Sequence, residues 1–146
     1  MRFIVDANIL LHSVNAASRD HGAARTFLDE HWQAGTAWCT TWPVLYEFLR
    51  VSTHRNVFAR PLEPEEALQF VAALAANPAV SILGDGPRHL ESLAKAIGRY
   101  PRPAGSIYHD LHTVALMQEY GVNEIITADV GFHRFRGIKV TNPLAG

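Results

Sequence analysis

The feature that most constrains the fold of this chain is the alternation of short, mainly apolar runs with longer amphipathic segments. Such runs are typical of strands that are covered on both faces. They occupy residues 2–5, 37–39, 80–83, 124–127 and 138–140. Strands separated by helices favour right-handed crossover connections and a parallel sheet with helices on both faces. We therefore predict a three-layer α/β/α fold with a mostly parallel five-stranded sheet.

The spacing of apolar residues also predicts which helical faces are buried. The helix that starts at Pro64 and the helix that follows the turn at residues 84–87 each show such a face. The first comprises Leu68, Val71, Ala72 and Leu74, and the second comprises Leu90, Leu93, Ala94 and Ile97. Ser106 follows an irregular loop at residues 101–105 and is expected to cap a further helix, which Gly121 ends.

Composition sets limits on the class of protein. At 146 residues, with 48% hydrophobic and 18% charged residues, the chain is expected to form one globular domain, residues 1–146. No apolar run approaches the roughly 20 residues of a membrane span, and the apolar N-terminus is too short for a signal peptide. Cys39 is the single cysteine, which fits a reducing cytoplasm. The net charge of −1 provides no general attraction for nucleic acid.

Acidic residues stand at positions where an α/β sheet forms ligand sites. Asp6 and Asp129 follow predicted strands, and the carboxyl ends of parallel strands form the crevice where ligands bind. Glu47 and Asp110 lie in predicted helices and need only point to the same edge. Each acid alone has a simpler explanation: Asp6 as a helix cap, Glu47 as a partner of Arg50, and Asp110 as a residue that complements its helix dipole.

Together, these carboxylates predict a metal site. Like charges gathered in one place raise one another's pKa, and a hard divalent cation is the usual compensation. Mg²⁺ or Mn²⁺ suits carboxylate oxygens, and such a site can activate water for attack on a phosphate.

Four segments in order resemble the PIN-domain family. They are residues 4–8 (IVDAN), residues 43–50 (PVLYEFLR), Asp110 in its amphipathic helix, and residues 127–132 (TADVGF). The closing residues 138–144 (IKVTNPL) make the chain most similar to the VapC-type toxins of toxin–antitoxin pairs. The resemblance covers nearly the whole chain.

The resemblance implies a metal-dependent endoribonuclease that is commonly a homodimer and is held inactive by an antitoxin protein. Asp6, Glu47, Asp110 and Asp129 match the acidic catalytic and metal-binding positions of the family. Asn8 and Thr127 match polar positions that orient those acids. Gly131 stands where many members have a further acid, so a second tightly held metal ion is not implied.

Other polar residues have two interpretations. Arg50, Arg55 and Arg134 are candidates for contact with RNA phosphates, with solvated surface as the alternative. His109 and His112 are spaced i, i+3, but no accompanying motif supports zinc, so surface or supporting positions are expected. Asp85 also follows a strand, although its Gly-Asp-Gly-Pro turn accounts for it.

Two alternative functions remain open at this point. Asp6 after the first strand also suits an aspartyl-phosphate nucleophile of a phosphohydrolase. A non-catalytic PIN-like interaction module is the other alternative. Apolar side chains on the first and fourth helices are expected to provide surface for a second copy and for an antitoxin segment; they are Leu10, Leu11, Leu68 and Phe70.

Overall fold

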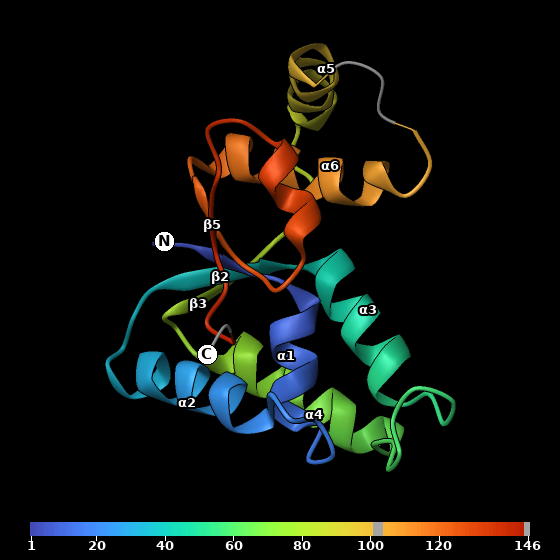
Figure 1. Cartoon of the computed structure of the whole chain (residues 1–146). Helices are drawn as coiled ribbons and strands as arrows, with labels where there is room; N and C mark the ends of the chain where they lie inside the picture. The colour runs from blue at the N-terminus through green and yellow to red at the C-terminus, as the bar shows by residue number, and fades with distance from the viewer. Residues whose placement is uncertain (101–103, 145–146) are drawn as a thin grey trace.

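A five-stranded parallel sheet forms the centre of the computed structural model, which describes residues 1–100 and 104–144 (Figure 1). The strands are β1 (Ile4–Val5), β2 (Trp38–Thr41), β3 (Val80–Leu83), β4 (Glu124–Ile126) and β5 (Lys139–Thr141). Their order is β3-β2-β1-β4-β5, and every neighbouring pair is parallel. The predicted α/β fold with a five-stranded parallel sheet is confirmed.

Helices cover both faces of the sheet, as Figure 1 shows. One layer holds α1 (Ala7–Val14), α2 (His21–Gln33), α3 (Trp42–Ser52) and α4 (Pro64–Ala76). The other holds α5 (His89–Arg99), α6 (Ile107–Tyr120) and the 3₁₀ helix η1 (Val130–Arg134). Among the described residues, no helix is long and apolar enough to cross a membrane.

The hydrophobic core has two parts, one on each face of the sheet, because side chains alternate in direction along each strand. Phe3, Val5 and Trp38 belong to the core under α1, α3 and α4, whereas Ile4 and Cys39 belong to the core under α6 and η1. Successive strand residues point to opposite faces, so a strand whose residues are all apolar serves both cores at once. This double burial explains why the strands are recognisable in the sequence as continuous apolar runs.

The predicted faces of α4 and α5 are partly wrong. In α4 the core contacts come from Ala67, Val71 and Leu74, and Leu68 is 60% exposed. In α5 only Ala96 is fully buried, and Leu90 is 78% exposed. Both helices carry apolar residues on more than one face, so periodicity alone did not determine which stripe is buried.

Two further expectations need correction. Leu10 was predicted to provide surface for a partner, but it is fully buried in the core. Ser106 directly precedes α6, but its side chain makes no capping hydrogen bond because its backbone is already helical. Of the predicted irregular loop at 101–105, residues 101–103 lie outside the described residues.

Candidate active site

The site begins where β1 and β4 end side by side. Val5 pairs with Ile126, and the Asp6 amide donates to the Ile126 carbonyl at 3.0 Å. Asp6 and Thr127 therefore leave the same edge of the sheet together. β1 lies between β2 and β4 in the sheet, so the chain continues from β1 to β2 on one side while β4 lies on the other side. A parallel sheet opens a ligand crevice at the carboxyl ends of two strands where the strand order changes direction in this way.

Hydrogen bonds fix the Asp6 carboxylate from several directions. Its Oδ1 accepts from the Ala7 amide at 2.8 Å. Its Oδ2 accepts from the Thr127 hydroxyl at 2.8 Å and from Asn8 Nδ2 at 3.2 Å. Asn8 Nδ2 also donates to Thr127 Oγ1 at 2.9 Å. Asp6 thus begins α1 as its cap residue and also lies at the centre of a polar network.

The same network holds the turn that carries Asp129. Asn8 Oδ1 accepts from the Ala128 amide at 2.9 Å, and Thr127 Oγ1 accepts from the Asp129 amide at 3.0 Å. The Asp129 carboxylate then accepts from the Gly131 amide at 2.8 Å, at the start of η1. Asn8 and Thr127 therefore orient both strand-end acids.

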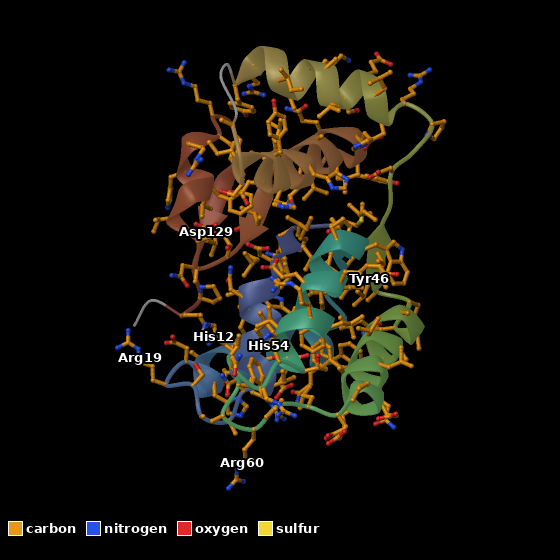
Figure 2. All side chains as sticks on the ribbon, turned by 90° about the vertical axis from the view of Figure 1, so that its right-hand side faces the viewer. His12, Arg19, Tyr46, His54, Arg60 and Asp129 are labelled. Carbon is orange, nitrogen blue, oxygen red and sulfur yellow. The ribbon has the colours of Figure 1, made fainter. Side chains whose placement is uncertain are left out.

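The four predicted acids line one pocket of about 780 Å³. Asp6 and Asp129 come from the sheet edge, Glu47 from the middle of α3, and Asp110 from the first turn of α6. Thr41 accepts from the Val44 amide at 3.1 Å and so caps the start of α3, which points Glu47 into the pocket. Figure 2 shows Asp129 and Tyr46, whose side chain also lines the pocket, on the face toward the viewer.

The electrostatics of the pocket are unfavourable to negative charge. Burial, followed by the charges of Asp129 and Asp6, raises the pKa of Asp110 to about 6. Burial also raises the pKa of Asp6, with a smaller contribution from Asp129 and against its hydrogen bonds. Burial and the charge of Asp6 raise the pKa of Glu47. The acids therefore repel one another in a partly dehydrated pocket.

No side-chain cation within the described residues forms an ion pair with any of these four acids. The carboxylate oxygens are also farther apart than the ligand atoms around one metal ion. No three of these acids bring their oxygens within 4.8 Å of one another. Carboxylates that form no ion pair and have space between them fit Mg²⁺ or Mn²⁺, which keep several waters when bound by proteins.

The predicted arginines have different positions. Arg50 lines the pocket. The Arg134 Nε donates to the Gly131 carbonyl at 2.8 Å. The positive charge of Arg134 also lowers the pKa of Asp110. Arg55 lies in the loop after α3 and is not part of the pocket wall. Figure 2 shows Arg60, from the same loop, far from Asp129.

Sequence reasoning gave too little weight to His109 and His112. Both line the pocket, and His109 lowers the pKa of Glu47 and Asp110. Both histidines lie within two residues of Asp110, and this spacing was the feature of the sequence that could have placed them at the pocket. A second, apolar pocket of about 280 Å³ between α1, α2 and α4 contains none of the four acids.

Comparison with known proteins identifies the family. The sequence model of the PIN domain matches residues 3–138. Ribonuclease VapC37 and ribonuclease VapC33 of Mycobacterium tuberculosis are 32% and 33% identical to this chain, over 142 and 144 residues. In each comparison 97% of both chains is covered.

Solved structures show the same fold. VapBC2 from Rickettsia felis, bound to a promoter DNA fragment, has a TM-score of 0.67 at 13% identity and covers 97% of this chain and 98% of that chain. VapC20 of M. tuberculosis, a toxin that cleaves the sarcin–ricin loop, has a TM-score of 0.63 at 19% identity, with 90% and 92% covered. The chain belongs to the PIN-domain family and, within it, to the VapC ribonucleases.

Proposed function

We propose that this protein is a VapC-type endoribonuclease toxin that hydrolyses RNA phosphodiester bonds, with Mg²⁺ or Mn²⁺ held by Asp6, Glu47, Asp110 and Asp129. The observation that carries the proposal is the convergence of these four acids, from four separate elements, on one pocket without an ion pair to any cation among the described side chains. Repelling carboxylates destabilise a fold, so a site that collects them suits a bound ion. PIN-domain nucleases are generally metal dependent.

The residues around the acids have separate tasks in this proposal. Asn8 and Thr127 hold Asp6 and the Asp129 turn in fixed orientations. Arg50 and His109, on the pocket wall, are placed to contact phosphates. A divalent cation lowers the pKa of water and offsets the charge of a phosphate under attack. The pocket volume lies within the usual range for ligand sites.

An aspartyl-phosphate mechanism is less well supported than a metal site. Asp6 Oδ1 accepts one hydrogen bond and Oδ2 accepts two. Oδ1 therefore keeps a free lone pair, which a metal ligand and a nucleophile both need. What favours a metal site is the gathering of Glu47, Asp110 and Asp129 with Asp6 in one pocket, because a mechanism with Asp6 as the nucleophile does not require all of them.

Cleavage of RNA tests the proposal directly. Purified protein should hydrolyse RNA with Mg²⁺ or Mn²⁺ and stop when a chelator is added. Asp6→Ala and Asp129→Ala should each reduce the rate at least roughly a hundredfold, a typical loss when one charge-stabilising group is removed. Asp29→Asn, on the exposed face of α2, is the matched control and should cleave normally. Cleavage that survives chelation or either alanine would refute the proposed site.

We also propose an antitoxin partner and a homodimer in the cytoplasm. Several of the solved relatives with this fold are VapBC complexes, which contain an antitoxin. Of the apolar side chains predicted for this role, Leu68 remains well exposed, whereas Leu11 and Phe70 are partly buried against the core. Light scattering should give a dimer at micromolar concentration, and co-expression with the adjacent reading frame should yield a stable complex. A monomer that binds no such product would contradict this part of the proposal.

A further inference from the structure

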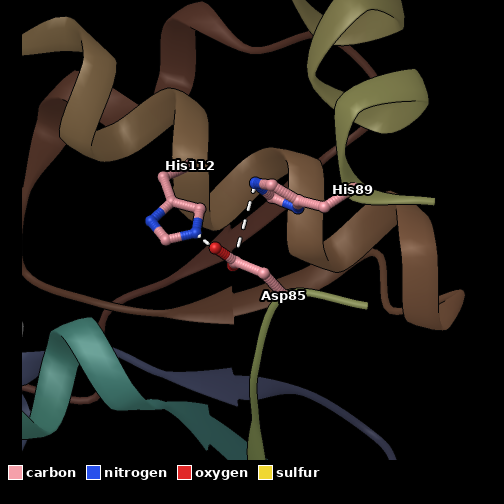
Figure 3. Close-up of side chains that lie close together, drawn as sticks. All are labelled: Asp85, His89 and His112. Atoms are coloured by element: carbon pink, nitrogen blue, oxygen red, sulfur yellow. Dashed lines mark hydrogen bonds and ion pairs between the residues drawn. The ribbon is translucent and has the colours of Figure 1, made fainter. Parts of the chain in front are cut away.

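Three side chains outside the four-acid site form a compact group with metal-ligand chemistry. Asp85 lies in the turn after β3, His89 is the first residue of α5, and His112 lies in α6. One nitrogen from each imidazole and one oxygen of Asp85 all lie within 4.8 Å of one another. Figure 3 shows the three side chains directed toward a common point.

The distances fit a small ion with only slight rearrangement. Asp85 Oδ1 lies 2.7 Å from His112 Nε2 and 3.7 Å from His89 Nε2. In a tetrahedral zinc site with bonds of about 2.0–2.2 Å, neighbouring ligand atoms are about 3.3–3.5 Å apart. The two measured distances lie on either side of that value. Small side-chain rotations would therefore bring all three atoms to bonding distance from one ion.

A further carboxylate fixes the orientation of His89. The Nδ1 atom of His89 lies 2.9 Å from Glu119 Oε2, and both side chains are largely buried. A carboxylate accepts hydrogen bonds, so Nδ1 carries a proton, and Nε2 is the nitrogen that faces Asp85 and can bind an ion in the neutral imidazole. A carboxylate behind a histidine is the usual support of a metal-binding imidazole.

We propose that Asp85, His89 and His112 form a transition-metal site of the Zn²⁺ class, separate from the four acids. Two imidazole nitrogens and one carboxylate oxygen favour Zn²⁺ over Mg²⁺, which prefers oxygen ligands. Three protein ligands leave the fourth tetrahedral position for water. This inference does not depend on the proposed nuclease activity.

The position of the site gives it a structural consequence. Its ligands come from the β3–α5 turn, from α5 and from α6, and α5 lies on the outside of the molecule in Figure 1. A bound ion would therefore fasten α5 to α6 and to the sheet. His112 also lines the large pocket two residues after Asp110, so the ion would add positive charge at the pocket wall.

Metal titration of the full chain tests the site without using activity. After chelation and dialysis, the protein is titrated with Zn²⁺ in buffer with excess Mg²⁺, and heat and melting temperature are recorded. Wild type should bind one Zn²⁺ at micromolar or lower concentration and melt at a higher temperature. His54→Gln, an exposed histidine in the loop after α3, is the matched control and should behave like wild type.

Variants of the ligands supply the decisive comparison. The double variant His89→Gln with His112→Gln should lose this binding, and Glu119→Gln should weaken it roughly tenfold because only the supporting charge is removed. If the double variant folds poorly, Asp85→Asn gives the same test, since Asp85 is in an exposed turn. Asp110→Asn should keep the zinc. Zinc binding that survives in the double variant or in Asp85→Asn, or that disappears in Asp110→Asn, would overturn the proposal.

Discussion

At the scale of single residues, Thr127 determines how precisely the acids are held. Its hydroxyl uses its full capacity: it donates to Asp6 and accepts from Asn8 and from the Asp129 amide. Thr127 is fully buried, so removal of the hydroxyl takes a partner from each of these groups at a position that lies inside the protein. A buried polar group left without a partner costs about 1–3 kcal/mol.

Thr127→Val should therefore lower the free energy of unfolding by about 1–3 kcal/mol. It should also reduce RNA cleavage at least roughly tenfold, because Asp6 and Asp129 lose a fixed orientation. Thr127→Ser keeps the hydroxyl and is the matched variant. Urea unfolding and single-turnover cleavage measure the two effects. If valine and serine behave alike, the hydroxyl does not orient the acids.

At the scale of elements, the sequence predicted what local patterns determine. Buried strands appear as continuous apolar runs, so the strand-end positions of Asp6 and Asp129 followed from the sequence. The buried faces of α4 and α5 did not follow from the sequence, because both helices carry apolar residues on more than one face. The cluster of Asp85, His89 and His112 was missed because α6 comes more than 20 residues later in the chain and its neighbours are set by packing.

The start of α3 links a local cap to the position of Glu47. Thr41 is buried and caps this helix through the Val44 amide, whereas Ser106 before α6 makes no such bond. Thr41→Ala should therefore cost about 1 kcal/mol of stability, the usual value for a lost cap, and Ser106→Ala should stay within about 0.5 kcal/mol. Chemical denaturation measures both. Equal losses would show that the Thr41 cap does not stabilise α3.

At the scale of the whole molecule, the four acids should make stability depend on pH. Asp110 has a pKa of about 6 in the folded protein, and the pKa values of Asp6 and Glu47 are also raised. An unfolded aspartate has a pKa of about 3.9. The folded state thus binds protons more tightly, so the contribution of these acids is most favourable below about pH 4 and is lost as pH rises through about 6. Bound metal should offset that loss.

The central claim is that Asp110 shares one metal site with the other acids, and melting curves of wild type and Asp110→Asn test it. In chelator at pH 7 the variant should melt higher, because it removes one repelling charge at nearly constant shape; about 1 kcal/mol corresponds to roughly 3 °C in a domain of this size. At pH 4 the difference should nearly vanish. Excess Mn²⁺ should stabilise wild type by mass action and the variant much less, with Asp29→Asn behaving as wild type throughout. A variant that melts lower in chelator at pH 7, or an equal shift of both proteins by Mn²⁺, would contradict a shared site.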